Sequence, residues 1–190
     1  MKSSPDPELT KLASNFTVRD YKAARDGKHR VRIAEGVRRR FTERYILPAA
    51  DGPNRHGFTM MAISCLMIEA FVSLQKGWKN SDGRSAEAFS SFFNDADLFR
   101  GFSGHEKQFY KNVRCGILHQ AEATGGWKIL RKGPLFDSGT NTVNAVRFMN
   151  TLQKVLNDFC DGLKAAPWDG AQWRSVCLKM DTICDNCTKI

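Results

Sequence analysis

Arg114 and His119 are the two residues of this 190-residue sequence whose types and spacing best suit chemistry. An imidazole transfers protons near neutral pH, and a guanidinium holds a phosphate group through paired hydrogen bonds. RNA cleavage needs both functions, because a proton must move at the 2′-hydroxyl or the leaving 5′-oxygen while charge on the transition state is stabilised. The pair supplies this chemistry without a metal ion.

The spacing of the two residues favours a site shared by two chains. Five residues along an α-helix turn by about 500°, so the side chains of Arg114 and His119 would lie about 140° apart around the axis and about 7.5 Å apart along it. One helix therefore does not focus both groups on one phosphate. Two copies that meet across a twofold axis can do so, which predicts a homodimer.

Spacing alone does not identify the site, because Arg100 and His105 are separated by the same interval. The stretch between Arg100 and His105 contains two glycines and a serine and is typical of a turn. Arg114 and His119 instead lie inside one predicted helix. Context therefore favours the second pair.

Helices supply most of the elements that must position this pair. Apolar residues recur at three- and four-residue steps, and the stretch from Phe58 to Leu74 is apolar nearly all round, as expected for a central helix. The pattern predicts an all-α fold, a five- to six-helix bundle with one small β-hairpin that turns at Lys132 and Gly133. The predicted helices cover 28–47, with Pro48 as the stop, 58–74, 86–98, 104–124, 141–163, with Asn141 as the N-cap, and 170–185.

Composition indicates a soluble globular protein, since 42% of the residues are hydrophobic and 26% are charged. We expect an N-terminal arm over 1–27, loose up to about Thr17, a helical bundle over 28–165, and a C-terminal helix and tail over 166–190. Six cysteines are too few for a disulfide scaffold, and the first residues are polar, so we expect a reduced, cytoplasmic protein. The apolar run carries Glu69 and has polar flanks, so we expect no membrane span.

The net charge of +9 points towards a polyanion as partner. Ten Lys or Arg and four Asp or Glu lie between Arg19 and Arg44, so this stretch holds +6 of the surplus. Contacts to RNA phosphates are one use of such a surplus, and a solvated helix face, paired with Glu35 and Glu43, is the alternative. The candidate RNA-binding residues are Arg32, Arg38, Arg39, Arg40 and Lys111.

Cys184 and Cys187 have the spacing of half a zinc site, but no second pair of the same kind accompanies them. Cys160 and Cys177 complete a site only if the last two helices bring them together. Free thiols are the favoured interpretation, so we expect no metal and no cofactor.

Residues 113–122, Val-Arg-Cys-Gly-Ile-Leu-His-Gln-Ala-Glu, followed by Gly-Gly-Trp at 125–127, resemble the Arg-x4-6-His helix of the HEPN superfamily. This superfamily consists of small helical-bundle proteins, many of them RNases of toxin–antitoxin and antiphage systems. The resemblance covers about residues 28–165, with only the motif helix specific. It implies a dimer that cuts RNA without metal, leaves a 2′,3′-cyclic phosphate, and uses Arg114 and His119 as catalytic residues.

Three further residues are candidates for supporting roles, namely Glu69, Cys115 and Gln120. Glu69 orients the motif arginine or lies near the cleft, or else pairs with any basic neighbour. Cys115 departs from the resemblance, because HEPN nucleases usually carry Asn, Asp or His directly after the arginine and a thiol is a weak donor.

This departure leaves an alternative open, a non-catalytic HEPN module that binds RNA or a protein partner such as an antitoxin. A basic DNA-associated helical protein is a third interpretation, for which no groove-reading motif is present.

Overall fold

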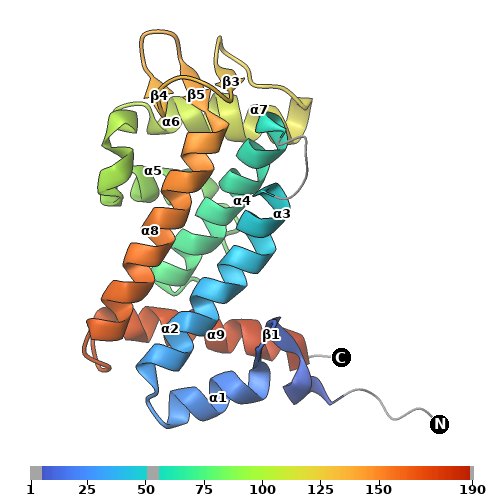
Figure 1. Cartoon of the computed structure of the whole chain (residues 1–190), viewed down its shortest axis with the longest axis vertical. Helices are drawn as coiled ribbons and strands as arrows, with labels where there is room; N and C mark the ends of the chain where they lie inside the picture. The colour runs from blue at the N-terminus through green and yellow to red at the C-terminus, as the bar shows by residue number, and fades with distance from the viewer. Residues whose placement is uncertain (1–5, 51–55, 189–190) are drawn as a thin grey trace, which may run out of the picture. The chain divides into compact units, whose positions relative to one another are not determined.

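The computed structural model describes residues 6–50 and 56–188, in which helices dominate. Contacts divide the chain into two compact units. Unit 1 comprises Met1–Arg44, Ser73–Asn80 and Leu156–Ile190, and unit 2 comprises Tyr45–Val72 and Ser81–Val155. The predicted all-α class with small β insertions is confirmed (Figure 1).

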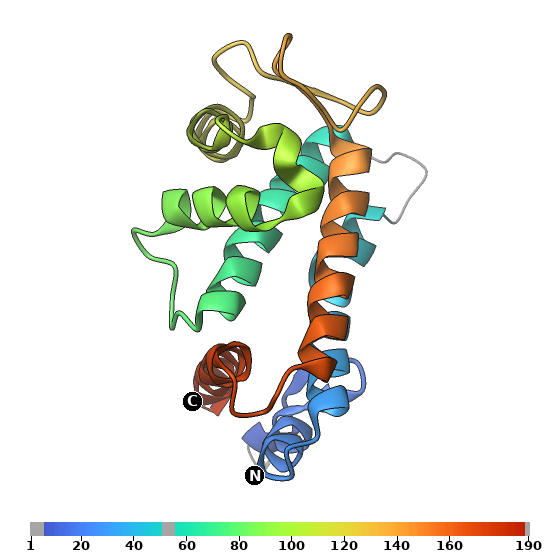
Figure 2. The ribbon, with the colours of Figure 1, turned by 90° about the vertical axis from the view of Figure 1, so that its left-hand side faces the viewer.

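Unit 1 is built from α1 (Val18–Asp26), α2 (Arg30–Phe41), α9 (Ala171–Thr188), and the ends of α4 (Gly57–Lys76) and α8 (Ala145–Ala165). Its core contains fully buried side chains from α1, α2 and α9. The Tyr21 hydroxyl is also buried there and donates to Asp181 Oδ1 over 2.9 Å, which links α1 to α9. Figure 2 shows how the chain turns after α8 and continues into α9.

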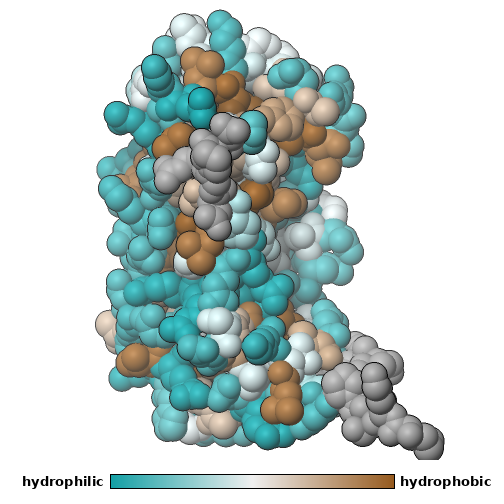
Figure 3. Space-filling model, turned by 45° about the vertical axis from the view of Figure 1, so that its right-hand side comes forward, coloured by the Kyte–Doolittle hydropathy of each residue, from teal (hydrophilic) through white to brown (hydrophobic). Residues whose placement is uncertain are grey.

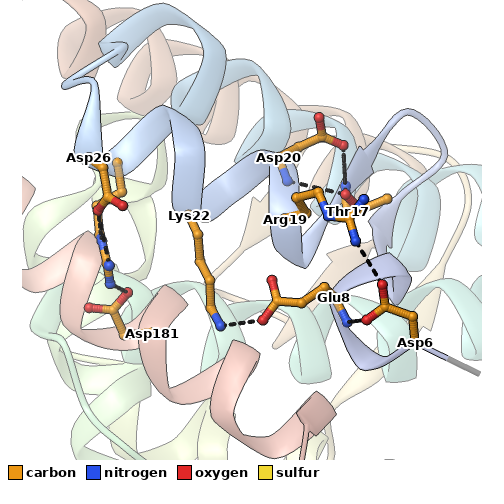
Figure 4. A network of polar contacts seen from close by, with 9 residues as sticks. Asp6, Glu8, Thr17, Arg19, Asp20, Lys22, Asp26 and Asp181 are labelled. Atoms are coloured by element: carbon orange, nitrogen blue, oxygen red, sulfur yellow. Dashed lines mark hydrogen bonds and ion pairs between the residues drawn. The ribbon is translucent and has the colours of Figure 1, made fainter.

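The first described residues belong to this packed unit and are not a loose arm. They form a 3-10 turn (Pro7–Leu9) and the antiparallel strands β1 (Lys11–Ala13) and β2 (Phe16–Thr17). Leu12 is fully buried, which a loose arm would not allow. Arg19 pairs with Asp6 over 2.7 Å, and Lys22 pairs with Glu8 over 2.5 Å (Figure 4). The residues before Asp6 lie outside the described part.

Unit 2 holds α3 (Leu47–Ala50), most of α4, α5 (Ser85–Asp95), a 3-10 turn (Asp97–Phe102), the helix over 106–120 that carries Arg114 and His119, here called the motif helix, and the first half of α8. Its core is aromatic, as the predicted helix over 86–98 suggested. The rings of Phe93 and Phe102 are stacked with centroids 4.7 Å apart, and those of Phe109 and Phe148 are stacked at 5.5 Å. These rings join α5, the motif helix and α8 around one centre.

A three-stranded sheet replaces the predicted hairpin. The strand β5 (Thr142–Asn144) lies between β3 (Lys128–Leu130), to which it is parallel, and β4 (Phe136–Asp137), to which it is antiparallel (Figure 1). The expected turn fails because its residues bond to β5 instead. Asn144 Nδ2 donates to the Gly133 carbonyl over 2.8 Å, and the Asn144 N–H donates to the Leu135 carbonyl over 3.1 Å.

Two predicted helix ends are also wrong. Asn144, not Asn141, caps α8, since its Oδ1 accepts from the Arg147 N–H over 3.1 Å and the residues before it are extended in β5. At Pro48 the helical path continues through a wide π-turn (Thr42–Ile46) into α3. Pro48 comes two residues after the π-turn and does not end the helical path.

The apolar helix α4 is long and apolar enough to span a bilayer, but 61% of its most apolar window is buried inside the protein. This burial agrees with the predicted central helix over 58–74. A buried core helix of a soluble protein has this composition.

Candidate active site

The motif helix is three joined pieces: α6 (Glu106–Phe109), a π-turn (Tyr110–Arg114) and α7 (Cys115–Gln120). The Cys115 N–H donates to the Tyr110 carbonyl, five residues back, where a regular α-helix bonds four residues back. Such π-turns are rare in proteins, and those that occur often lie at functional sites. The sequence predicted an uninterrupted helix here, so the π-turn is an addition.

The loop after the motif helix folds back onto it. The helix ends at Gln120, before the predicted Gly-Gly stop, because Ala121 adopts a left-handed φ of 54°. The Thr124 N–H donates to the Asn112 carbonyl over 2.9 Å. A Cβ atom on Gly116 would lie 2.5 Å from the Glu122 carbonyl oxygen, so only glycine permits this close approach.

Glu69 contacts the motif arginine. Arg114 Nε donates to Glu69 Oε1 over 2.8 Å, and Ser85 Oγ donates to Glu69 Oε2 over 2.6 Å. Glu69 is 9% exposed, and the Arg114 side chain is 17% exposed. Both carboxylate oxygens are therefore engaged in a largely buried site that joins α4, α5 and the motif helix.

The Arg114 guanidinium keeps its positive charge in this site. Burial by itself lowers the pKa of the Arg114 guanidinium, but the hydrogen bond and charge of Glu69 outweigh it, so the pKa lies above its usual value. The Tyr110 ring lies 5.6 Å from Arg114 Cζ, within the range of a cation–π contact. Burial raises the pKa of the Tyr110 hydroxyl, and its hydrogen bond with Cys115 raises it further. The site thus holds a fixed guanidinium cation between a carboxylate and an aromatic ring.

Cys115, the residue that departs from the resemblance, lies inside this cluster. Its thiol lies close enough to Tyr110 and Arg114 to raise the pKa of both. Cys65, on α4, is buried beside the same groups, and burial raises the pKa of its thiol.

Sequence reasoning missed Tyr110, Ser85 and Cys65. Tyr110 stands four residues before Arg114, which is the spacing of neighbours on a helix face and was a usable signal. Nothing in the sequence indicates that Ser85 meets Glu69.

His119 and Gln120 are exposed at the end of α7, whereas Arg114 is turned towards Glu69. Within one chain, Arg114 and His119 therefore lie in different settings, one held by a buried carboxylate and the other exposed to solvent. Next to His119, Leu118 is 57% exposed, and Leu66 on α4 is 55% exposed. Figure 3 shows hydrophobic groups at the surface of unit 2 on the side that it presents.

The control pair Arg100 and His105 lies in a different setting. Arg100 is in a 3-10 turn and pairs with the exposed Asp97 over 2.8 Å. The His105 ring packs against Phe136 with centroids 5.2 Å apart. Neither residue contacts a buried carboxylate in the described part of the chain.

The candidate RNA-binding arginines lie on α2 in unit 1, and Lys111 is exposed on the motif helix in unit 2. Most of the arginines contact protein oxygens. Arg32 pairs with Asp20 over 2.6 Å, Arg38 pairs with Asp161 over 2.6 Å, and Arg40 donates to the Leu12 carbonyl over 2.9 Å, while Arg39 is exposed. Their role in RNA binding stays a prediction.

Among residues 6–50 and 56–188, no group of three or more His, Cys, Asp or Glu side chains is arranged to hold a metal ion. Cys160 and Cys184 are buried free thiols, and Cys177 and Cys187 are partly exposed free thiols.

No family model matches this chain, and neither a curated protein nor a solved structure matches it.

Proposed function

We propose that this protein is a metal-independent endoribonuclease of the HEPN type. The observation that carries the proposal is the buried contact of Glu69 with Arg114 Nε, five residues before an exposed histidine on the same short helix. The contact engages Nε and not the terminal η nitrogens, which are the fork that binds phosphate. Carboxylate, arginine and histidine together form an orienting group, a phosphate ligand and an acid–base group.

The reaction would proceed by transfer of the phosphate within the RNA. The 2′-oxygen attacks phosphorus while His119 accepts its proton, the bond to the 5′-oxygen breaks, and that oxygen receives a proton from an imidazolium. Arg114 stabilises the charge on the phosphorane-like transition state. The products are a 2′,3′-cyclic phosphate and a 5′-hydroxyl, and no metal or cofactor enters the step.

A homodimer would complete the site. Glu69 holds Nε of Arg114 and His119 is exposed to solvent, and a second chain would bring its own histidine beside the first chain's arginine. Leu66, three residues before Glu69 on α4, and Leu118, next to His119, are exposed and suit such a contact. We place the protein in the cytoplasm, in antiphage defence or a toxin–antitoxin system, on the resemblance of residues 113–127 alone.

One observation favours a second function, a non-catalytic module that binds RNA or a regulatory protein such as an antitoxin. A thiol, that of Cys115, stands next to Tyr110 and Arg114 at the position where HEPN nucleases carry a stronger hydrogen-bonding side chain. A site of this kind retains Arg114, which can bind phosphate, and lacks the polar side chain that usually follows the arginine.

The test is incubation of the purified protein with end-labelled structured RNA in EDTA. We expect cleavage that leaves cyclic phosphate ends and falls by at least about a hundredfold in His119→Ala, because acid–base catalysis contributes that much. The matched control is His105→Ala, which removes a histidine at the same spacing from an arginine and should cleave normally.

Normal cleavage by His119→Ala would exclude the mechanism. Absence of cleavage by folded wild-type protein, with RNA still bound, would favour the non-catalytic module.

A further inference from the structure

A second site, unrelated to the motif helix, lies in unit 1 where α8 turns into α9. A cavity of about 310 Å³ is lined by Arg25, Trp168, Asp169, Trp173, Arg174 and Cys177. The two indole rings lie 4.8 Å apart at an angle of 36°. Trp173 is 1% exposed and forms a buried wall, whereas Trp168 is only partly buried and presents an aromatic face.

The Trp173 indole N–H has no hydrogen-bond partner although it is buried. Among the described residues only one other buried side-chain polar atom, Arg38 Nε, is in that position. An unpaired buried donor costs about 1–3 kcal/mol, so such a group calls for an explanation. Trp173 is also one of the residues that line the cavity, so the unpaired donor belongs to a residue of its wall.

The two arginines that line the cavity differ in the partners that they already have. Arg25 is already paired with Asp181 over 2.7 Å and with Asp26 over 3.1 Å. Arg174 is exposed, and its Nη1 donates to the Asp169 backbone carbonyl, which holds the guanidinium at the cavity. Arg174 also lies in the first turn of the 18-residue helix α9, where backbone N–H groups and the helix dipole favour an anion.

Asp169 adds the opposite requirement. Its exposed carboxylate accepts N–H donors, so a ligand needs donors at one edge, an acceptor at another, a flat aromatic face and an anionic group. Cationic ligands, which aromatic pockets often bind, are disfavoured by two lining guanidinium groups.

We propose that this cavity binds a guanine nucleotide, either free or as an unpaired residue of single-stranded RNA. The base stacks on Trp168, its paired N–H donors face Asp169, and its carbonyl or ring nitrogen accepts from Trp173. The phosphate lies on Arg174 and the start of α9. This site goes beyond the proposed nuclease and does not depend on it, because binding at unit 1 requires neither Arg114 nor His119.

The experiment measures affinity for two probes that the proposed nuclease cannot cleave. The first is GMP, followed by calorimetry. The second is a single-stranded 2′-O-methyl oligonucleotide of alternating guanosine and uridine, which lacks the attacking hydroxyl and is followed by fluorescence anisotropy. Binding of GMP identifies a free nucleotide as a ligand, and binding of the oligonucleotide alone identifies RNA.

The variants are Trp168→Leu and Arg174→Gln, each of which changes an incompletely buried side chain. We expect Trp168→Leu to weaken binding by about tenfold, since stacking on one aromatic residue contributes this much. We expect a similar loss in Arg174→Gln, because the phosphate loses its charged hydrogen-bond donor. Arg100→Gln is the control, because it removes another exposed arginine, one that belongs to unit 2. Thermal unfolding verifies that every variant is folded.

Three results of this binding experiment would contradict the proposed site. Failure of both probes to bind folded wild-type protein overturns the site. Unchanged affinity in Trp168→Leu and Arg174→Gln overturns its location. Equal affinity for GMP and AMP overturns the guanine assignment, because adenine offers Asp169 a single amino group. Loss of RNA cleavage in the separate EDTA assay has no bearing on any of these outcomes.

Discussion

At the scale of single residues, the candidate active site depends on one carboxylate. Glu69 is largely buried and satisfies two partners at once, Arg114 at 2.8 Å and Ser85 at 2.6 Å. A buried ion pair contributes little net stability, but removal of one partner leaves an uncompensated charge, which is costly. The pair therefore fixes the position of the arginine more than it stabilises the fold.

Glu69→Gln tests this role, since it keeps the shape of the side chain and removes its charge. We expect the free energy of unfolding to fall by about 2 kcal/mol, less than the roughly 3–5 kcal/mol of a fully buried broken pair, because both side chains are partly exposed. We expect RNA cleavage to fall by at least about tenfold, as the guanidinium loses its orienting partner. Urea denaturation and single-turnover cleavage measure the two effects.

The exposed pair of Arg84 and Glu87 supplies the control for that variant. Glu87→Gln removes a carboxylate that lies 2.9 Å from an arginine at the surface, where such pairs contribute at most about 1 kcal/mol. Equal effects of Glu69→Gln and Glu87→Gln would contradict a special role for Glu69.

Sequence reasoning selected Arg114, His119 and Glu69 because their types limit what each can do. The contact of Glu69 with Arg114 was one of two expectations for that residue, and it is present. Ser85 was not found, because a serine in a polar turn gives no sign of a partner 16 residues away. Partners that are distant in sequence depend on how helices pack, which residue type does not encode.

At the scale of elements, the motif helix is supported by its own loop. Gly116 lies where the Glu122 carbonyl crosses the helix, and the space for a Cβ is taken by a backbone atom that has little freedom to move. Alanine would favour the helix, but the clash opposes it.

Gly116→Ala should lower the free energy of unfolding by about 1–3 kcal/mol, because overpacking against backbone outweighs a helix-propensity gain of about 1 kcal/mol. The matched control is Gly162→Ala on α8, where a Cβ would meet nothing within 4 Å. That variant should instead stabilise the protein by about 0.5–1 kcal/mol. Denaturant unfolding measures both, and stabilisation by both variants would refute the bracing of the motif helix.

The long helices were predictable because their apolar residues repeat over many turns, as in α4 and α8. The short strands were not, since β5 has three residues and β2 has two, too few for alternation to appear. The pairing of β5 with β3 depends on contacts across the chain, and so do the two π-turns, which add a residue without changing the composition of the helix.

At the scale of the whole molecule, the proposed nuclease requires two chains. If Arg114 of one chain acts with His119 of the other, mixing the variants Arg114→Ala and His119→Ala restores one intact site in each mixed dimer. Half of the dimers are mixed after random exchange, so activity should recover to about a quarter of the wild-type value. Each variant alone should be inactive.

Light scattering first establishes the molar mass of the wild-type protein in solution, and cleavage assays on the mixture follow. Inactivity of the exchanged mixture, with mixed dimers demonstrated by tagged chains, would show that each site takes both residues from one chain. A monomeric wild type that cleaves RNA would exclude the shared site altogether.

The π-turn in the motif helix determines the orientation of the residues that follow it. The turn absorbs one extra residue, so a segment of the same length wound as a regular α-helix would rotate the residues after it by about 100°. The regular helix would have the better hydrogen bonds, and its histidine would point elsewhere. Under the proposed function, the stability of the helix and the orientation of His119 therefore favour different windings of this segment.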